Sequence, residues 1–176
     1  MAVIDLTQLD QFKAVAPVGL ESGEPRTFFS PVDDVHGALK SVIASATKSL
    51  VIAMYGFDDE ELADIILTKL QDEHIYVQLT LDSSQAGGVH EKRILADRQY
   101  PATSVAIGRS ERGAIMHLKM VVVDGINVIS GSTNWSDGGE SKQDNQMTVH
   151  ASLGFANECR SRIDAIHANM VTKNAQ

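Results

Sequence analysis

The chain has 176 residues, of which 43% are hydrophobic, so it is long enough for one well-buried core and too short for two ordinary domains. No apolar segment approaches the roughly 20 residues of a membrane-spanning helix, and the first residues lack the basic start and apolar run of a signal peptide. We therefore expect a cytoplasmic protein without stable membrane association. The single cysteine, Cys159, cannot form an internal disulfide and is interpreted as a packing residue.

The formal net charge of −8 argues against a nucleic-acid partner, because affinity for a polyanion depends on cations. The charge is unevenly distributed, however. Residues 88–119 carry a net charge of +3, which leaves −11 for the rest of the chain. This basic stretch fits either a nucleic-acid contact or an ordinary solvated surface. Its basic residues are Lys92, Arg93, Arg98, Arg109, Arg112 and Lys119.

The N-terminal part predicts an irregular arm followed by a helix. Residues 1–26 contain scattered glycines and prolines and predict an arm outside a single domain of residues 27–176. Ser30-Pro31 has the composition of a helix start, with a serine cap and proline at the first helical position. Apolar residues at helical spacing then predict a helix to about Lys48.

The next segments predict alternating strands and helices. Residues 49–55 form a nearly continuous apolar run, typical of a strand covered on both faces. A helix is predicted from Asp58 to Leu70, and its acidic start (residues 58–61) is interpreted as helix capping in preference to a metal site. Residues 74–82 predict a strand and residues 89–98 a helix. This alternation indicates an α/β fold with a mixed, largely parallel sheet sandwiched between helices.

The C-terminal half predicts a hairpin, a further strand and a final helix. Residues 115–123 and 126–133 are apolar and β-branched, and Asp124-Gly125 between them is a strong hairpin signal. A strand is predicted over residues 146–151 and a helix over residues 155–170. We find no internal repeat.

Four polar residues of this hairpin are predicted to share one face. A two-residue loop sets His117 opposite Ser132, and a four-residue loop sets His117 opposite Asn134. Either even loop places both of these residues and Lys119 on one surface, whereas an odd loop or a bulge would break the arrangement.

This face combines a histidine, a cation, a hydroxyl and an amide, and it has no carboxylate. It therefore favours the binding of an anion. Lys119 and Asn134 are suited to hold the oxygens of a phosphoryl group, and His117 supplies a nucleophile or proton carrier. The alternative is a structural histidine beside a lysine that extends along the sheet. The other histidines form no metal-binding pattern, and Lys119 would repel a divalent cation, so we expect neither metal nor cofactor at this site.

The spacing of these residues resembles the phospholipase D superfamily. His117-Leu118-Lys119, then Asp124 after four residues, then Gly131-Ser132-Thr133-Asn134 after six more, matches the superfamily signature. The wider pattern, which includes Phe28 to Pro31, Tyr55 to Phe57 and a strand closed by Asp82, resembles the small bacterial endonucleases of that superfamily. The resemblance covers roughly residues 28 to 168.

The resemblance implies a role for each matching residue. His117 would attack phosphorus to give a phosphohistidine, Lys119 and Asn134 would bind the phosphate, and Ser132 would support the phosphate or the hairpin. Asp124 and Gly131 would be structural. In the family a downstream carboxylate followed by asparagine orients the histidine. The matching residue here is Asp144, with a shorter side chain and one residue less spacing, and Glu140 is the alternative.

Such histidine chemistry needs two imidazoles, and the chain has one motif. We therefore expect a homodimer that places His117 of each subunit across one phosphate. The implied activity is a metal-independent phosphodiesterase, most simply a nonspecific endonuclease, with DNA favoured over RNA. Two alternatives remain: a phospholipase D or phosphatidyl transferase acting on phospholipids, and a catalytically inactive nucleic-acid-binding module.

Overall fold

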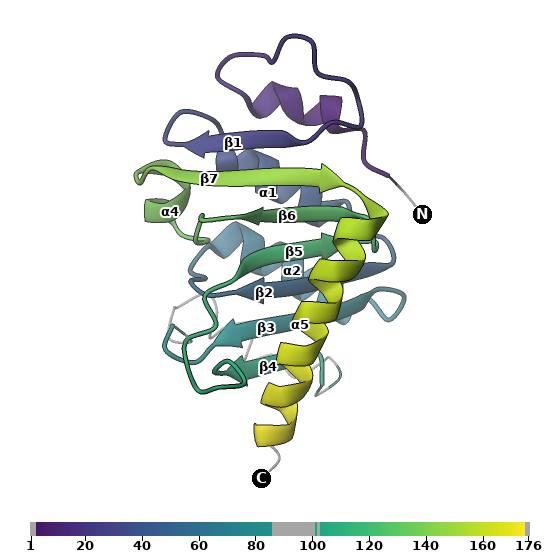
Figure 1. Ribbon diagram of the computed structural model, residues 1–176, viewed down its shortest axis with the longest axis vertical. Helices are drawn as coiled ribbons and strands as arrows, with labels where there is room; N and C mark the ends of the chain where they lie inside the picture. The colour runs from purple at the N-terminus through teal and green to yellow at the C-terminus, as the bar shows by residue number, and fades with distance from the viewer. Residues whose placement is uncertain (1–2, 86–100, 102, 175–176) are drawn as a thin grey trace.

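One seven-stranded sheet organises the computed structural model, in which residues 3–85, 101 and 103–174 are described (Figure 1). The strand order is β1-β7-β6-β5-β2-β3-β4. The strands are β1 (Arg26–Ser30), β2 (Ser49–Met54), β3 (Tyr76–Asp82), β4 (Val105–Gly108), β5 (Lys119–Val123), β6 (Asn127–Gly131) and β7 (Asn145–Ala151).

The expected mixed α/β fold is confirmed, but the expected predominance of parallel pairing is wrong. Only β2 with β3 and β3 with β4 are parallel, and the other four neighbouring pairs are antiparallel. One reason is the three-residue connection from β5 to β6, which is too short for a crossover and makes these two strands antiparallel.

Helices cover both faces of the sheet. Helices α1 and α2 lie on one face, and α5 crosses the other in front of the central strands (Figure 1). Within the described residues, no helix is both long and apolar enough to span a bilayer. The described helices are η1 (Leu6–Phe12, 3-10), α1 (Val35–Ala44), α2 (Glu60–Gln71), α4 (Asp137–Ser141) and α5 (Leu153–Asn174).

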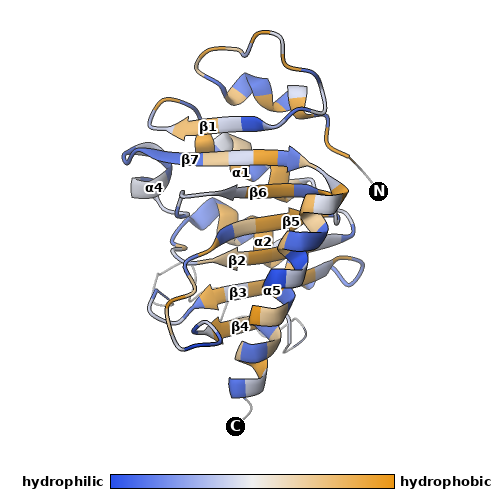
Figure 2. Ribbon diagram, in the orientation of Figure 1, coloured by the Kyte–Doolittle hydropathy of each residue, from blue (hydrophilic) through white to orange (hydrophobic). Residues whose placement is uncertain are grey.

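The apolar run of β2 serves two hydrophobic clusters. Leu50 and Ile52 face the cluster beneath α1 and α2, and Val51 and Ala53 face the cluster beneath α5. The central strands are accordingly the most hydrophobic part of the sheet (Figure 2). This confirms a strand buried on both faces. In the second cluster Cys159 is buried as expected, and burial raises the pKa of its thiol.

The N-terminal segment contributes to the main core. Leu6 and Leu9 of η1 are buried in the cluster beneath α1, and Arg26 is buried with its guanidinium 2.7 Å from Asp10. Helix η1 and Arg26 therefore pack on the domain, although the boundary after residue 26 stays a prediction.

The helix predicted to start at Ser30-Pro31 begins later. Ser30 ends β1, and its hydroxyl donates to the carbonyls of Gly139 and Gln143 instead of capping a helix. The cap of α1 is Asp34, whose carboxylate accepts from the Gly37 amide. By contrast, the capping predicted for residues 58–61 is confirmed, because Asp59 accepts from Leu62 at the start of α2. The helix predicted over residues 89–98 lies outside the described residues.

Asp124 joins the β5–β6 connection to the start of β2. Val123 pairs with Asn127, so three residues form the connection, and Asp124 adopts a left-handed backbone with φ 52°. Its buried carboxylate accepts from the amides of Thr47, Lys48 and Ser49 and from the Thr47 hydroxyl. Burial alone would raise the pKa of this carboxyl, but these donors outweigh burial and lower it. The structural role expected for Asp124 therefore has a physical basis.

We predict that Asp124→Ala lowers the free energy of unfolding by about 3 kcal/mol, because three backbone amides lose a charged acceptor. Asp124→Asn, the control, keeps one oxygen acceptor and tolerates the left-handed backbone, so its loss should be smaller. Because the folded-state pKa is lowered, the advantage of wild type over Asp124→Asn should be constant above about pH 5 and shrink as the pH falls below about 4. Urea unfolding at several pH values measures this, and equal stability of wild type and Asp124→Ala would contradict it.

Candidate active site

His117 lies just before β5, on a segment held at both sides. The carboxylate of Asp82, at the end of β3, accepts from the Met116 amide at 2.6 Å. The Tyr55 amide, just after β2, donates to the Leu118 carbonyl at 2.9 Å. The two neighbours of His117 are therefore fixed to the ends of two parallel strands, while the imidazole itself is exposed.

Lys119 and His117 are in direct contact. The Lys119 Nζ lies 2.9 Å from His117 Nε2 and 3.2 Å from the His117 carbonyl oxygen. An ammonium can only donate, so Nε2 accepts in this hydrogen bond and a neutral ring carries its proton on Nδ1. This arrangement leaves the lone pair of Nε2 occupied by Lys119 until another acceptor takes the ammonium.

Tyr55 completes a cluster with these two residues. Its ring centroid is 4.5 Å from that of His117, and Lys119 Nζ lies 4.8 Å from the centre of the Tyr55 ring. The ring face is electron-rich and favours the ammonium. The Tyr55 hydroxyl in turn accepts a long hydrogen bond, 3.4 Å, from Gln85.

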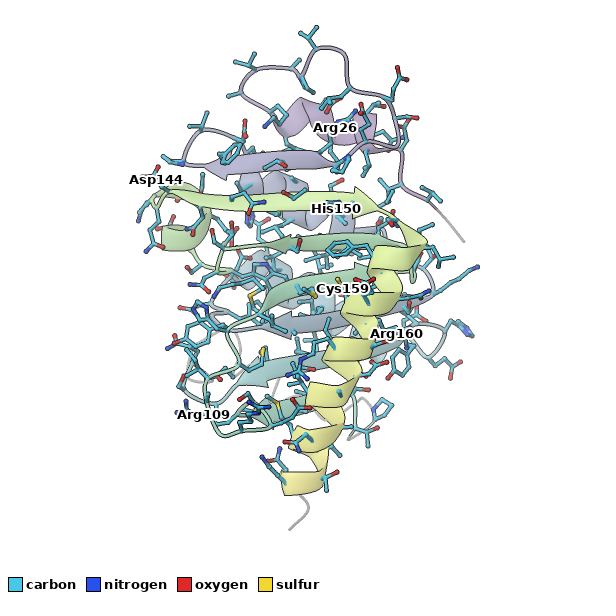
Figure 3. All side chains as sticks on the ribbon, viewed as in Figure 1. Arg26, Arg109, Asp144, His150, Cys159 and Arg160 are labelled. Carbon is cyan, nitrogen blue, oxygen red and sulfur yellow. The ribbon has the colours of Figure 1, made fainter. Side chains whose placement is uncertain are left out.

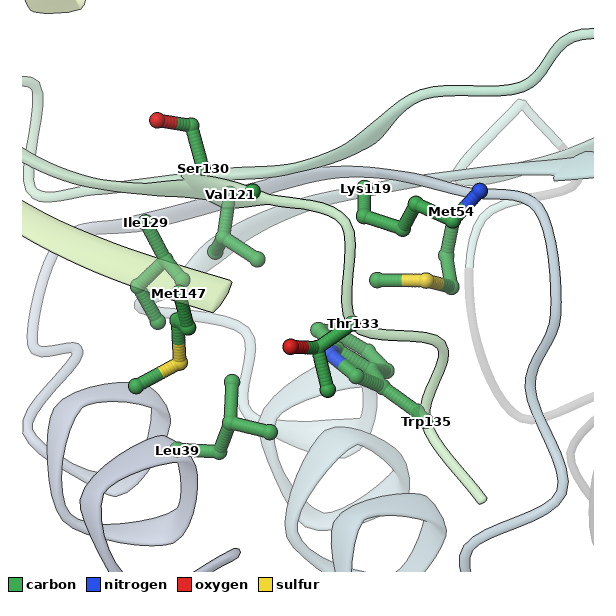
Figure 4. A pocket seen from close by; sticks show the side chains of 10 residues that line it. Leu39, Met54, Lys119, Val121, Ile129, Ser130, Thr133, Trp135 and Met147 are labelled. Atoms are coloured by element: carbon green, nitrogen blue, oxygen red, sulfur yellow. The ribbon is translucent and has the colours of Figure 1, made fainter. Parts of the chain in front are cut away.

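Lys119 is a buried cation without an acidic partner among the described residues. Its side chain lines an apolar cavity of about 10 Å³ beside Met54, and its nitrogen lies at the end away from Leu39 and Met147 (Figure 4). Only 7% of the residue is exposed, and burial lowers the pKa of its amine. Among the described residues, no carboxylate forms an ion pair with it. A desolvated cation of this kind favours an incoming anion.

Asn134 lies beside Gly56 and takes a different path from the one predicted. The three-residue connection gives an odd register, so the strand pairing that was expected to place Ser132 and Asn134 on the face of Lys119 is wrong. The chain leaves β6 after Gly131, and Trp135 donates to the carbonyl of Gly56, next to Tyr55.

The amide of Asn134 therefore packs against Gly56. A Cβ at Gly56 would lie 3.0 Å from the amide carbon of Asn134, so this position favours glycine, because a side chain there would force the Asn134 amide to shift. The Asn134 Oδ1 is buried and accepts no hydrogen bond within the described structure. Asn134 also lines a hollow of about 330 Å³ with Ser84 and Gln85.

Ser132 and Gly131 support β7. The Ser132 hydroxyl donates to Asn145 Oδ1 at 2.9 Å and accepts from the Gln146 amide at 3.0 Å. A Cβ at Gly131 would lie 2.0 Å from the Gln146 carbonyl oxygen, so this position also requires glycine. Ser132 thus holds the hairpin to β7 in this structure.

Neither of the two carboxylates considered for orienting His117 contacts it within one chain. Asp144 is exposed before β7, on the same side of the molecule as Arg109 (Figure 3). Glu140 is buried, and its Oε2 lies 2.6 Å from Nδ1 of His36 instead. The side chains that the structure brings together are therefore His117, Lys119 and Tyr55, with Asn134 beside Gly56.

Tyr55 and Asp82 were part of the sequence resemblance but were not assigned to the site. Both stand at the carboxyl ends of buried parallel strands, where α/β proteins commonly place functional groups. Asp82 positions the backbone beside His117, and three donors, two from Ser84 and one from Met116, outweigh burial to lower the pKa of its carboxyl. Trp135 packs in the core against Phe57.

Solved structures share this fold. NucT from Helicobacter pylori superposes with a TM-score of 0.72 and 23% sequence identity, over 83% of this chain and 96% of that one. Nuc from Salmonella typhimurium, described as a phospholipase D family member, gives a TM-score of 0.67 and 20% identity, over 83% of this chain and 96% of that one. At these identities the likeness establishes the fold alone.

Sequence comparison identifies the family. A curated relative, the mitochondrial cardiolipin hydrolase of Chlamydomonas reinhardtii, is 25% identical over 107 residues, which are 61% of this chain and 46% of that protein. The chain thus spans about half the length of that relative. The family model described as "Cardiolipin synthase, PLD-like domain" matches residues 39–167, most of the chain. The protein therefore belongs to the family of phospholipase D-like domains.

Proposed function

We propose that the protein is a metal-independent phosphodiesterase, most simply a nonspecific endonuclease that hydrolyses nucleic-acid phosphodiester bonds. The observation that carries this proposal is the buried ammonium of Lys119, which contacts His117 and, among the described residues, no carboxylate. A phosphodiester is an anion that such a cation would bind, and His117 lies in position to react with it.

The contact between Lys119 and His117 suggests how binding starts the reaction. A non-bridging phosphate oxygen replaces His117 Nε2 as the acceptor of the hydrogen bond from the Lys119 ammonium. The lone pair on His117 Nε2 is then free. Nε2 then attacks phosphorus, a P–N bond forms, and the P–O bond to the leaving group breaks. The leaving oxygen takes a proton from a second imidazole. That imidazole then removes a proton from water, which attacks phosphorus and breaks the P–N bond.

The second imidazole is proposed to come from another copy of the chain. Each chain has one motif, and His117 and Ile115 are both exposed on the segment that enters β5. A two-fold axis beside this segment would bring the two rings to one phosphate.

The other site residues take supporting roles in this proposal. Rotation of the Asn134 amide would direct its NH₂ to a phosphate oxygen, and Ser132 holds the hairpin through Asn145. Asp144 is retained as the carboxylate that orients His117. Because it makes no contact with His117 within one chain, that contact requires the partner chain or a movement of the segment before β7.

Nucleic acid is favoured as the substrate, and a phospholipid is the second candidate. Arg109 and Arg112 are exposed near the segment that carries His117, whereas Lys92, Arg93 and Arg98 lie outside the described residues. The endonuclease proposal also rests on the resemblance to the small bacterial endonucleases. The phospholipid candidate is favoured by the names of the matching family and of the curated relative, both of which concern cardiolipin.

We predict cleavage of plasmid, single-stranded DNA or RNA in excess EDTA, with activity that falls as salt rises. His117→Ala should reduce the rate by about 10⁴-fold or more while nucleic-acid binding persists. Gel assays and fluorescence anisotropy measure the two properties, and His74→Ala, at an exposed histidine, is the control. Hydrolysis of cardiolipin vesicles with no nuclease activity would favour the lipid candidate, and binding without any cleavage would favour an inactive binding module.

The shared site predicts a specific result for mixed dimers. Wild-type and His117→Ala chains are combined in equal amounts and allowed to exchange subunits. If each site needs both imidazoles, the mixture should retain about a quarter of the activity of the same total amount of wild type. About one half would instead indicate that each chain works alone.

Lys119→Met should remove anion binding while preserving the fold, because methionine retains most of the stem that lines the apolar cavity. We predict that affinity for inorganic phosphate, measured from the NMR shifts of the His117 ring, falls by about tenfold or more. Lys48→Met, which removes an exposed charge, is the control and should bind phosphate as wild type does. Unchanged affinity in Lys119→Met would contradict the assignment of Lys119.

A further inference from the structure

A second titratable cluster lies apart from the one around His117. His36 is on α1, Asp59 caps α2 and Glu140 is on α4. The His36 Nδ1 is 2.6 Å from Glu140 Oε2 and 3.0 Å from Asp59 Oδ2. One ligand-type atom from each of the three residues lies within 4.8 Å of the others. The cluster opens into a surface hollow of about 440 Å³.

With both carboxylates ionised, the charges in this cluster are not balanced by protein groups among the described residues. Glu140 is only 4% exposed, and its Oε1 is buried with no hydrogen-bond partner within the described structure. Burial and then the nearby Asp59 carboxylate raise the pKa of Glu140 to about 7. One imidazolium cannot neutralise two carboxylates, and the nearby ammonium of Lys40 already contacts Glu61. The site therefore lacks positive charge.

We propose that His36 Nδ1, Asp59 Oδ2 and the carboxylate of Glu140 bind one divalent transition-metal ion of the zinc type. A doubly charged ion would balance both carboxylates with His36 neutral, and an imidazole with two carboxylates is a ligand set that zinc accepts. Ligand atoms around zinc are about 3.3 Å apart, so the two contacts of Nδ1 would lengthen by less than about 1 Å. The hollow leaves room for water at the remaining coordination positions of the ion. The ion would also be a partner for Glu140 Oε1.

The surroundings of the three ligands support this site. The other ring nitrogen, His36 Nε2, lies 3.6 Å from Glu61 Oε2, and Lys40 holds that carboxylate. A carboxylate behind a ligating histidine is a common arrangement at zinc sites, because it orients the ring and raises its basicity. Asp59 serves both purposes at once, since Oδ1 caps α2 while Oδ2 faces His36.

An ion here would join segments that also build the site around His117. The Asp58 amide donates to the Trp135 carbonyl, so the chain just before Asp59 is bonded to the chain just after Asn134. Binding would therefore stabilise the positions of residues 55–59 and 134–140. Its role would be structural, and the inference does not depend on the proposed phosphodiesterase activity.

The test uses the metal-free protein and Zn²⁺, with Mn²⁺ and Mg²⁺ for comparison. Isothermal titration calorimetry should give one Zn²⁺ site per chain, and Tm should rise by about 5–10 °C at roughly 100 times Kd. Asp59→Asn keeps an oxygen to cap α2 and removes one charged ligand, so it should fold while its Zn²⁺ affinity falls about tenfold or more. Glu140→Gln should show the same loss of affinity. Glu60→Gln removes an exposed charge from the same hollow and should bind Zn²⁺ as wild type does.

Two results would overturn the inference. One is the absence of Zn²⁺ binding tighter than about 100 µM in wild type, a threshold at which binding contributes about 5 kcal/mol. The other is Zn²⁺ affinity that is the same in Asp59→Asn, Glu140→Gln and wild type, since the ion would then bind elsewhere. Nuclease activity in EDTA is a separate measurement, so failure here leaves the proposed function untouched.

Discussion

The contact between the buried ammonium of Lys119 and the imidazole of His117 is the interaction on which the candidate site depends. Lys119 opens β5 directly opposite Met54, the last residue of β2, and the antiparallel pairing of these strands sets where its charge emerges. The stem lines an apolar cavity, the ring of Tyr55 faces the ammonium, and Asp82 fixes the chain beside His117. Each of these contacts comes from the end of a central strand, so the sheet itself positions the charge.

Two clusters of opposite character are joined by the same pair of segments. The cluster around His117 has a cation and no acidic partner within the described residues, whereas the cluster around His36 has two carboxylates and a single imidazole. Residues 55–59 and 134–140 run between them and are bonded to each other by the Trp135 and Asp58 amides. One cluster is thus suited to an anion and the other to a cation. The stability of this pair of segments should govern how well both clusters are preorganised for their ligands.

The sequence predicted the components of the fold better than their assembly. The strand predicted over residues 49–55, the capping predicted for residues 58–61 and the buried face of α5 follow from local sequence patterns and were confirmed. β1 was missed because its partner is β7, more than a hundred residues away, and the local signal at Ser30-Pro31 resembled a helix start.

Only part of the candidate site was predicted, for a similar reason. His117 and Lys119 are two residues apart, which predicted that their side chains share one face of a strand. These are the two groups that are in contact. The register of the hairpin was wrong because Ile126 joins the connection, which no local pattern indicated. The positions of Tyr55 and Glu140 depend on how distant segments pack, and residue spacing contains no information on that packing.

The most direct test of the proposed chemistry is to trap its covalent intermediate. A substrate with ³²P at the scissile phosphate is mixed with excess protein in EDTA and quenched in alkali, where a phosphohistidine survives, and the label is located by mass spectrometry. The account predicts labelling at His117 that disappears in His117→Ala. Cleavage that proceeds with no labelled histidine, or with the label on another residue, would contradict it.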